Sequence, residues 1–196
     1  MKKIFLILSI IGLVSLNSCS KMLDTDPTNQ VSGTIIFADA QNSLTAINGI
    51  YRILYTGGWG SSWAAENGGL PAYILVFDIM GEDHVMDAAG SGWFWYDYGF
   101  DTWGDYSGKA GHQYQIWNFF YTQIANANYI IAQEGKIPGD QELADYVVGQ
   151  AYAIRSFAYM WLVQCYQQND PTKPGVPIYT EPTVAGSIGN PRGTVQ

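Results

Sequence analysis

A stretch rich in aromatic and acidic side chains, SGWFWYDYGFDTWGDY at residues 91–106, is the part of the sequence best suited to binding a ligand. Tryptophan and tyrosine provide large, flat and rigid surfaces, and aspartate provides hydrogen-bond acceptors. The glycines between them disfavour regular structure, so a loop can hold the rings at the surface. Sugars present faces of C–H groups edged by hydroxyls. This mixture of residues therefore predicts carbohydrate binding without a chemical step.

We expect the rings to stack on sugar faces and the carboxylates to accept hydrogen bonds from sugar hydroxyls. The candidates are Trp93, Trp95, Tyr96 and Trp103 for stacking and Asp97, Asp101 and Asp105 as acceptors, with Trp59 and Trp63 as a second rank. The competing interpretation is that most of these rings pack the stretch onto the rest of the protein, since buried aromatics usually form core. The alternation along residues 93–98 also fits a strand with two covered faces.

A second group of potential ligands lies in GEDHVMD at residues 81–87, which brings together Glu82, Asp83, His84 and Asp87. Carboxylates can bind calcium, and a pair of them can hydrolyse a glycosidic bond. The fixed ligand spacing of an EF-hand loop is missing, however, and the sequence does not identify a second carboxylate placed across a bond. We interpret these residues as a solvated acidic loop.

The sequence lacks the motifs of several other chemistries. His84 and His112 do not have the spacing of zinc ligands. There is no nucleophile elbow, phosphate loop or dinucleotide fingerprint. Cys165 is the only cysteine after Cys19, which excludes a disulfide framework, and its helical setting indicates a small buried apolar residue. We expect no cofactor, no metal and no enzymatic activity.

The first residues have the layout of a secretory signal. Lys2 and Lys3 precede an apolar run of about 13 residues, Ile4 to Leu16, and roughly 18 to 20 would be needed to span a bilayer. Cys19 follows in a setting similar to the lipobox of bacterial lipoproteins, in which the peptidase cuts before the cysteine and acyl chains are attached to it. We expect a lipid anchor on Cys19. An ordinary secreted protein with a spare cysteine is the alternative.

Charge and composition narrow the class of partner. The formal net charge is −8, and the loss of Lys2 and Lys3 with the signal would make it more negative. Nucleic acid and other polyanions are therefore poor partners. Hydrophobic residues make up 47% of the chain, which is enough to build a core.

Three stretches have helical periodicity. Asp39 is placed to cap a first helix over residues 40–54, and a second helix spans about residues 111–133. The second is apolar nearly all round, so it should lie between other helices. The third begins after the capping residue Asp140, keeps a three-four spacing as far as Cys165, and ends before a proline-rich turn.

The region between the first two helices has no sustained helical pattern. Residues 57–110 are rich in glycine, tryptophan and aspartate and predict an ordered, loop-rich excursion. Within it, residues 72–79 could form a short strand or a buried apolar run.

Four segments occur in an order that is typical of one protein family. They are CSKMLDTDP, FADAQNSLTAINGIYRILY, YQIWNFFYTQIANANYIIAQ and GQAYAIRSFAYMWLVQCYQQNDPTKPGVPIYTEP. The last contains the pattern Gly-x-Ala-x-x-x-Arg-(Ala/Ser)-x-x-Tyr at Gly149, Ala151, Arg155, Ser156 and Tyr159. With these motifs the chain resembles the SusD/RagB-type family of nutrient-binding outer-membrane lipoproteins over nearly all of its length after Cys19.

The resemblance implies a mainly α fold, in which a tetratricopeptide-like helical-repeat scaffold carries the loop-rich aromatic excursion between its first and second helices. Residues 1–18 would be the lipoprotein signal peptide, residues 19–36 the lipidated Cys19 and a tether, and residues 37–196 the N-terminal SusD-like helical region. Because members of the family are longer, the resemblance also implies an incomplete domain. We interpret Arg155 as structural, with its guanidinium satisfied by a carboxylate or by carbonyls of the proline-rich turn.

The same resemblance implies a function. The protein would be exposed at the outer membrane, capture an oligosaccharide, and pass it to a SusC-like TonB-dependent transporter over which it sits as a lid. Two alternatives stay open, a surface glycoside hydrolase and a structural lid of the transporter that binds no glycan.

Overall fold

A computed structural model describes residues 33–59, 67–81, 83–88, 90, 92–99, 111–168, 170–184 and 186–194. All of these residues except Gly33, Thr34 and Ile35 belong to the second of the chain's two units, Ile36–Gln196. The elements in chain order are α2 (Gly33–Ile36), α3 (Ala40–Ile53), α4 (Leu70–Met80), α5 (Trp95–Tyr98), α6 (His112–Ile131), α7 (Gln141–Tyr166), β1 (Pro174–Pro177) and β2 (Arg192–Thr194). The described part is mainly helical, which confirms the predicted fold class, while its tetratricopeptide-like character stays a prediction.

The three helices predicted from periodicity are α3, α6 and α7, and the two predicted caps are present. The side chain of Asp39 accepts a hydrogen bond from the amide of Asn42 at 2.7 Å. The side chain of Asp140 accepts one from the amide of Leu143 at 3.2 Å. Each cap satisfies an amide that the first turn of a helix leaves without an intrahelical partner.

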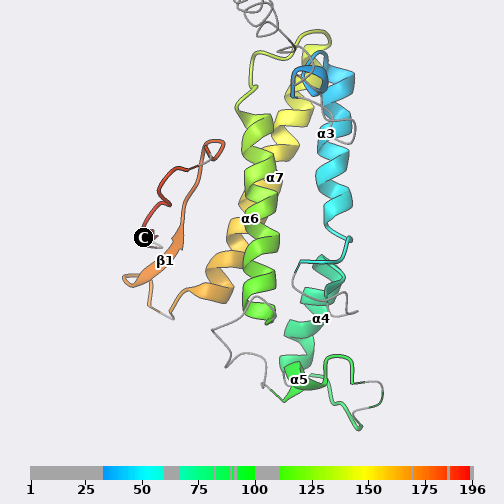
Figure 1. Cartoon of the computed structure of the whole chain (residues 1–196), viewed down its shortest axis with the longest axis vertical. Helices are drawn as coiled ribbons and strands as arrows, with labels where there is room; N and C mark the ends of the chain where they lie inside the picture. Colours follow the sequence, from blue (N-terminus) through cyan, green and yellow to red (C-terminus); the bar gives the residue numbers. More distant parts are fainter. Residues whose placement is uncertain are drawn as a thin grey trace, which may run out of the picture. The chain divides into compact units, whose positions relative to one another are not determined.

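Helices α6 and α7 pack side by side along the second unit, and α3 packs against both (Figure 1). Their shared core is aliphatic and nearly inaccessible to water, and includes Ile47, Ile50, Ala127, Ile130, Val147, Ala151 and Ile154. Toward the other end of α6 the core becomes aromatic, with Tyr73, Phe119 and Phe120 fully buried. Helix α6 thus has two helical neighbours, but α3 also contacts α7 directly, so the three helices pack mutually and α6 is not enclosed between the other two as its sequence predicted.

Two alternatives were predicted for residues 72–79, a short strand or a buried apolar run; they lie in helix α4, so the strand is wrong, while the side chains of Ala72, Tyr73, Val76 and Ile79 are buried. The helix begins after Gly69, whose φ of +78° is a left-handed value that glycine adopts without strain. The amide of Leu70 donates to the carbonyl of Leu54 at 2.7 Å, and a Cβ on Gly69 would lie 2.5 Å from that same oxygen. Pro71 then occupies the first turn, where its missing N–H has no cost. The close approach at Gly69 thus fixes where the helix starts.

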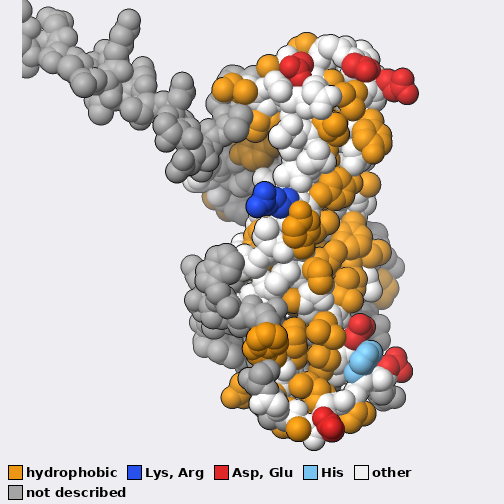
Figure 2. Space-filling model, turned by 90° about the vertical axis from the view of Figure 1, so that its right-hand side faces the viewer, with side chains coloured by type: hydrophobic (Ala, Val, Ile, Leu, Met, Phe, Trp, Pro, Cys, Tyr) orange, Lys and Arg blue, Asp and Glu red, His pale blue; other side chains and the backbone are white. Residues whose placement is uncertain are grey.

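The apolar sequence of α4 explains why periodicity did not reveal it. Tyr73, Val76 and Ile79 are buried, yet Ile74 and Leu75 on the outer side are apolar as well. A helix that is apolar on every side has no alternation of polar and apolar residues to detect. Figure 2 shows hydrophobic side chains over much of the face on the side where α3 and α4 lie in Figure 1.

The segment after β1, which we call the strap (residues 178–182), is held against α6 and α7 through its main chain. Asn128, 1% exposed, donates from Nδ2 to the carbonyls of Tyr179 at 3.0 Å and Glu181 at 3.2 Å. The hydroxyl of Tyr159 donates to the carbonyl of Tyr179 at 3.0 Å and accepts from its amide at 2.6 Å. Hydrogen bonds to its main chain therefore fix this extended segment in place.

Arg155 completes this network. Its Nη1 donates to Oδ1 of Asn128 at 2.8 Å and to the carbonyl of Thr180 at 3.1 Å. The predicted structural role of Arg155 is confirmed. We expected a carboxylate or a carbonyl of the proline-rich turn as its partner, and the structure shows the carbonyl of Thr180.

Candidate functional site

The candidate site is the aromatic turn (residues 92–99), which consists of α5 and the residues just before it. Phe94 caps α5 with a φ of +58°, the one left-handed value among the described residues other than glycine. A bulky residue in this region is rare because its Cβ is crowded. The ring of Phe94 is buried against Ala72, Val76 and Ile79 of α4, and this burial holds the strained conformation. Phe94 therefore attaches the turn to α4.

A buried contact between a carboxylate and an imidazole attaches the turn to α6. Oδ1 of Asp97 lies 2.5 Å from Nδ1 of His112, and the two residues are 1% and 5% exposed. Tyr73 of α4 lies edge-on to His112, with ring centroids 6.3 Å apart at 73°. We expected Asp97 to accept sugar hydroxyls, but in the structure its carboxylate faces inward and binds His112. Asp97 thus positions α5 instead of presenting a carboxylate to solvent.

Two of the predicted stacking rings lie at the surface of the turn. Trp93 is 58% exposed and Tyr96 is 59% exposed. Trp95 is half-buried, with its ring 6.1 Å from that of Tyr98 at an angle of 37°. The alternative prediction of a strand over residues 93–98 is wrong, because these residues form a turn and a short helix. The turn therefore contains both kinds of ring that we considered, Phe94 in the core and Trp93 and Tyr96 in solvent.

The other predicted site residues are placed as follows. Cys19, Trp63, Asp101, Trp103 and Asp105 lie outside the described residues. Trp59, a second-rank candidate, packs into the core. Its Nε1 donates to the carbonyl of Thr56 at 2.7 Å, and its ring meets that of Phe119 edge-on at 5.1 Å.

The acidic loop carries exposed side chains at Asp83, His84 and Asp87, while Glu82 lies outside the described residues. Among the residues that the structure describes, no three histidine, cysteine, aspartate or glutamate side chains form a group that could hold a metal ion. The two histidines are in different settings, since His84 is exposed and His112 is buried in its pair with Asp97.

Sequence reasoning missed the two residues that anchor the turn. Phe94 lies within the aromatic stretch but has no feature that distinguishes its ring from its neighbours. His112 lies 15 residues from Asp97 in the sequence, and contacts between residues so far apart have no fixed spacing from which they could be predicted. The left-handed position before α5 could not be predicted either, because glycine usually marks such positions and Phe94 occupies this one.

The comparisons with known proteins give one match. A family model described as "Starch-binding associating with outer membrane" matches residues 76–196, well over half of the chain. The match includes the aromatic turn, α6, α7 and the strap. Neither a curated protein nor a solved structure matches the chain. Within the described residues, no helix has the length and apolar character needed to cross a membrane.

Proposed function

Because the chain belongs to the SusD-like family of starch-binding proteins that associate with the outer membrane, we propose that it captures an oligosaccharide on its aromatic turn. Trp93 and Tyr96 would stack on the apolar faces of successive sugar units. The observation that carries this proposal is the exposure of these two rings, 58% and 59%, on a backbone that buried contacts hold in place. Single exposed rings are common on protein surfaces, whereas two exposed rings on one fixed turn form a patch of the kind that ligands use.

The turn is suited to stacking because its supports are independent of its exposed rings. Phe94 is anchored to α4, and Asp97 is anchored to α6 through His112. A sugar that binds Trp93 and Tyr96 therefore needs to order little of the protein, and preorganisation of this kind strengthens binding. Bonds to the rims of the sugar rings would come from residues such as Asp101 and Asp105, which remain candidates.

Capture rather than catalysis is the proposed mechanism. The ligand would be held by stacking and hydrogen bonds and then released to a SusC-like TonB-dependent transporter, so weak binding would be useful. A lipid anchor on Cys19 would keep the protein beside the transporter and raise the local concentration of the captured sugar.

The test compares the full chain with a Trp93→Ala/Tyr96→Ala double variant on an affinity gel that contains amylose. Loss of each stacking ring should weaken retention by roughly tenfold, the factor that about 1.4 kcal/mol represents. Tyr146→Ala is the matched control, because Tyr146 on α7 is 60% exposed and lies outside the aromatic turn. Its retention should equal that of the unmodified chain.

Two outcomes would contradict the proposal. Equal retention of the double variant and the control would favour a structural lid that binds no glycan through these rings. New reducing ends after incubation with soluble starch would favour the glycoside hydrolase alternative, since capture leaves the polysaccharide intact.

A further inference from the structure

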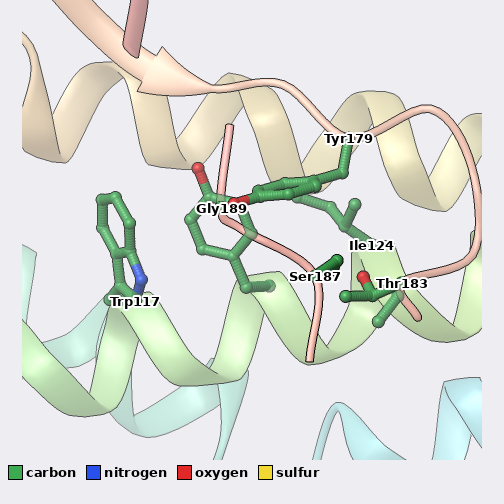
Figure 3. A pocket seen from close by; sticks show the side chains of 8 residues that line it. Trp117, Ile124, Tyr179, Thr183, Ser187 and Gly189 are labelled. Atoms are coloured by element: carbon green, nitrogen blue, oxygen red, sulfur yellow. The ribbon is translucent and has the colours of Figure 1, made fainter. Parts of the chain in front are cut away.

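A separate recess lies between α6 and the chain after β1, and we call it the Trp117 groove (Figure 3). Its volume is about 270 Å³. Trp117 and Tyr121 stand one turn apart on α6, Tyr179 closes the opposite side, and Thr183 and Ser187 lie at the end farther from Trp117. None of the residues that line the groove belongs to the aromatic turn.

The aromatic walls of the groove are fixed before any ligand arrives. The ring centroids of Trp117 and Tyr121 are 4.6 Å apart, and Tyr179 meets Tyr121 edge-on at 5.9 Å and 85°. The hydroxyl of Tyr121 donates to the carbonyl of Pro177 at 2.7 Å. The hydroxyl of Tyr179 accepts from the amide of Asn190 at 3.1 Å. A ligand would therefore meet rings that are already ordered.

The end opposite Trp117 is polar but uncharged. Within the described chain, no hydrogen bond engages the hydroxyl of Thr183 or of Ser187, and both can donate to or accept from a ligand. No charged side chain lines the groove. Arg192 lies over Trp117 at 5.5 Å, but its Nη1 donates to main-chain carbonyls of Tyr166 and Gly175.

These features define the chemistry of a ligand. Flat rings on the two sides call for an apolar face, and the hydroxyls of Thr183 and Ser187 at one end call for polar edges. Because none of the described lining residues is charged, the groove suits a neutral molecule. Ligand clefts usually measure about 300 to 1,000 Å³, so a groove of about 270 Å³, just below this range, suits a single ring. We propose that the Trp117 groove binds one pyranose unit of a glycan, as a second subsite separate from the aromatic turn. This inference rests on the proposed function, because that function supplies the glycan.

The experiment follows the indole Nε1–H resonance of Trp117 in the full chain during titration with maltoheptaose. Trp117→Phe assigns the resonance and keeps a ring in the wall. We expect the chemical shift of this resonance to change as maltoheptaose is added and to reach a plateau at saturation. Ser187→Phe, which places a ring in the groove, should abolish the shift, and Thr183→Ala/Ser187→Ala should weaken the apparent affinity several-fold. Ile188→Phe is the matched control, since Ile188 is 95% exposed on the same segment and does not line the groove.

The outcomes separate the two proposals. A Trp117 shift that persists in Trp93→Ala/Tyr96→Ala and disappears in Ser187→Phe supports a second subsite. If maltoheptaose binds the chain with no Trp117 shift, or if the shift survives Ser187→Phe, the groove is not a subsite, while capture on the aromatic turn stands. If Trp117 shifts while the aromatic-turn variant retains full binding, the groove inference stands and capture on the turn is overturned.

Discussion

Tyr73 is a buried side chain whose polar end lacks a partner. The residue is fully inaccessible to solvent, and its hydroxyl makes no hydrogen bond with the described part of the chain. The ring contributes to the aromatic core, where Phe119 meets it edge-on at 5.3 Å. Burial also raises the pKa of the Tyr73 hydroxyl, because the phenolate would lose its hydration. The ring therefore stabilises the fold, and the hydroxyl does not.

Tyr73→Phe should make the protein more stable. Removal of an unpaired buried hydroxyl should raise the free energy of unfolding by about 1 kcal/mol near neutral pH. Above about pH 10, tyrosine ionises in the unfolded chain but stays protonated in the folded one, so the unfolded state gains and stability falls as pH rises. Phenylalanine cannot ionise, so the advantage of the variant should grow in this range. Urea unfolding at pH 7 and pH 10.5 measures both effects.

Tyr159→Phe is the control for this prediction. The hydroxyl of Tyr159 donates to the carbonyl of Tyr179 and accepts from its amide, so its removal leaves that amide without this partner, while the carbonyl keeps its bond from Asn128. This variant should lose stability, by about 1 kcal/mol or more. A Tyr73→Phe protein that is destabilised to the same extent would show that the Tyr73 hydroxyl has a partner after all.

The sequence shows which side chains are aromatic or acidic, but it does not show which of them are buried or what they contact. Trp93 and Tyr96 could be selected because ring type and neighbouring glycines are visible in the sequence. The inward carboxylate of Asp97 could not, because its partner His112 comes from another helix and side-chain burial depends on tertiary packing. The roles of residues outside the described chain, Trp103 among them, stay predictions.

At the scale of elements, the pair of Asp97 and His112 joins α5 to α6. Asp97→Ala would leave His112 buried without its carboxylate partner, and an unsatisfied buried polar group costs about 1–3 kcal/mol. We expect faster hydrogen exchange of the amides of residues 94–99, weaker retention on amylose, and little change in the amides of α3. Asp97→Asn, which keeps the shape of the side chain, should show the same changes in smaller degree.

Asp87→Ala is the matched control, since Asp87 is an exposed carboxylate in the same part of the chain. It should change neither hydrogen exchange nor retention. If Asp97→Ala left exchange in residues 94–99 as slow as before, the pair would not be what holds the turn in place.

The elements that the sequence predicted well are those with strong periodicity or explicit caps. Helices α3 and α7 begin after Asp39 and Asp140, as expected, because cap chemistry is local. Helix α4 was missed because its apolar residues occupy every side, and its start depends on a contact between Gly69 and Leu54. The aromatic turn was correctly placed between the first two long helices, but its short helix depends on the burial of Phe94.

At the scale of the whole molecule, the family places the protein at the outer membrane, and we propose that a lipid on Cys19 attaches it. Cys19→Ala should move the protein from the carbonate-washed membrane pellet to the soluble fraction, because the acylation site is lost. Immunoblots of the two fractions provide the measurement.

Cys165→Ala is the control for the anchor. Cys165 lies half-buried in α7, and burial raises the pKa of its thiol to about 12, so it is protonated and unreactive at neutral pH. The Cys165 variant should stay in the pellet. A Cys19→Ala protein that also stayed there would contradict the lipobox interpretation.

The strap is recognised through its peptide groups. Asn128, Arg155 and Tyr159 all bind carbonyl oxygens or an amide of residues 179–181, and every residue other than proline carries both groups. Homologous chains could therefore exchange the exposed side chains of Ile178, Thr180 and Glu181 and keep the same path, provided that the three helical residues and the packed ring of Tyr179 are retained. Variation at these three positions would accordingly be free to alter what the exposed edge contacts, with little penalty in folding.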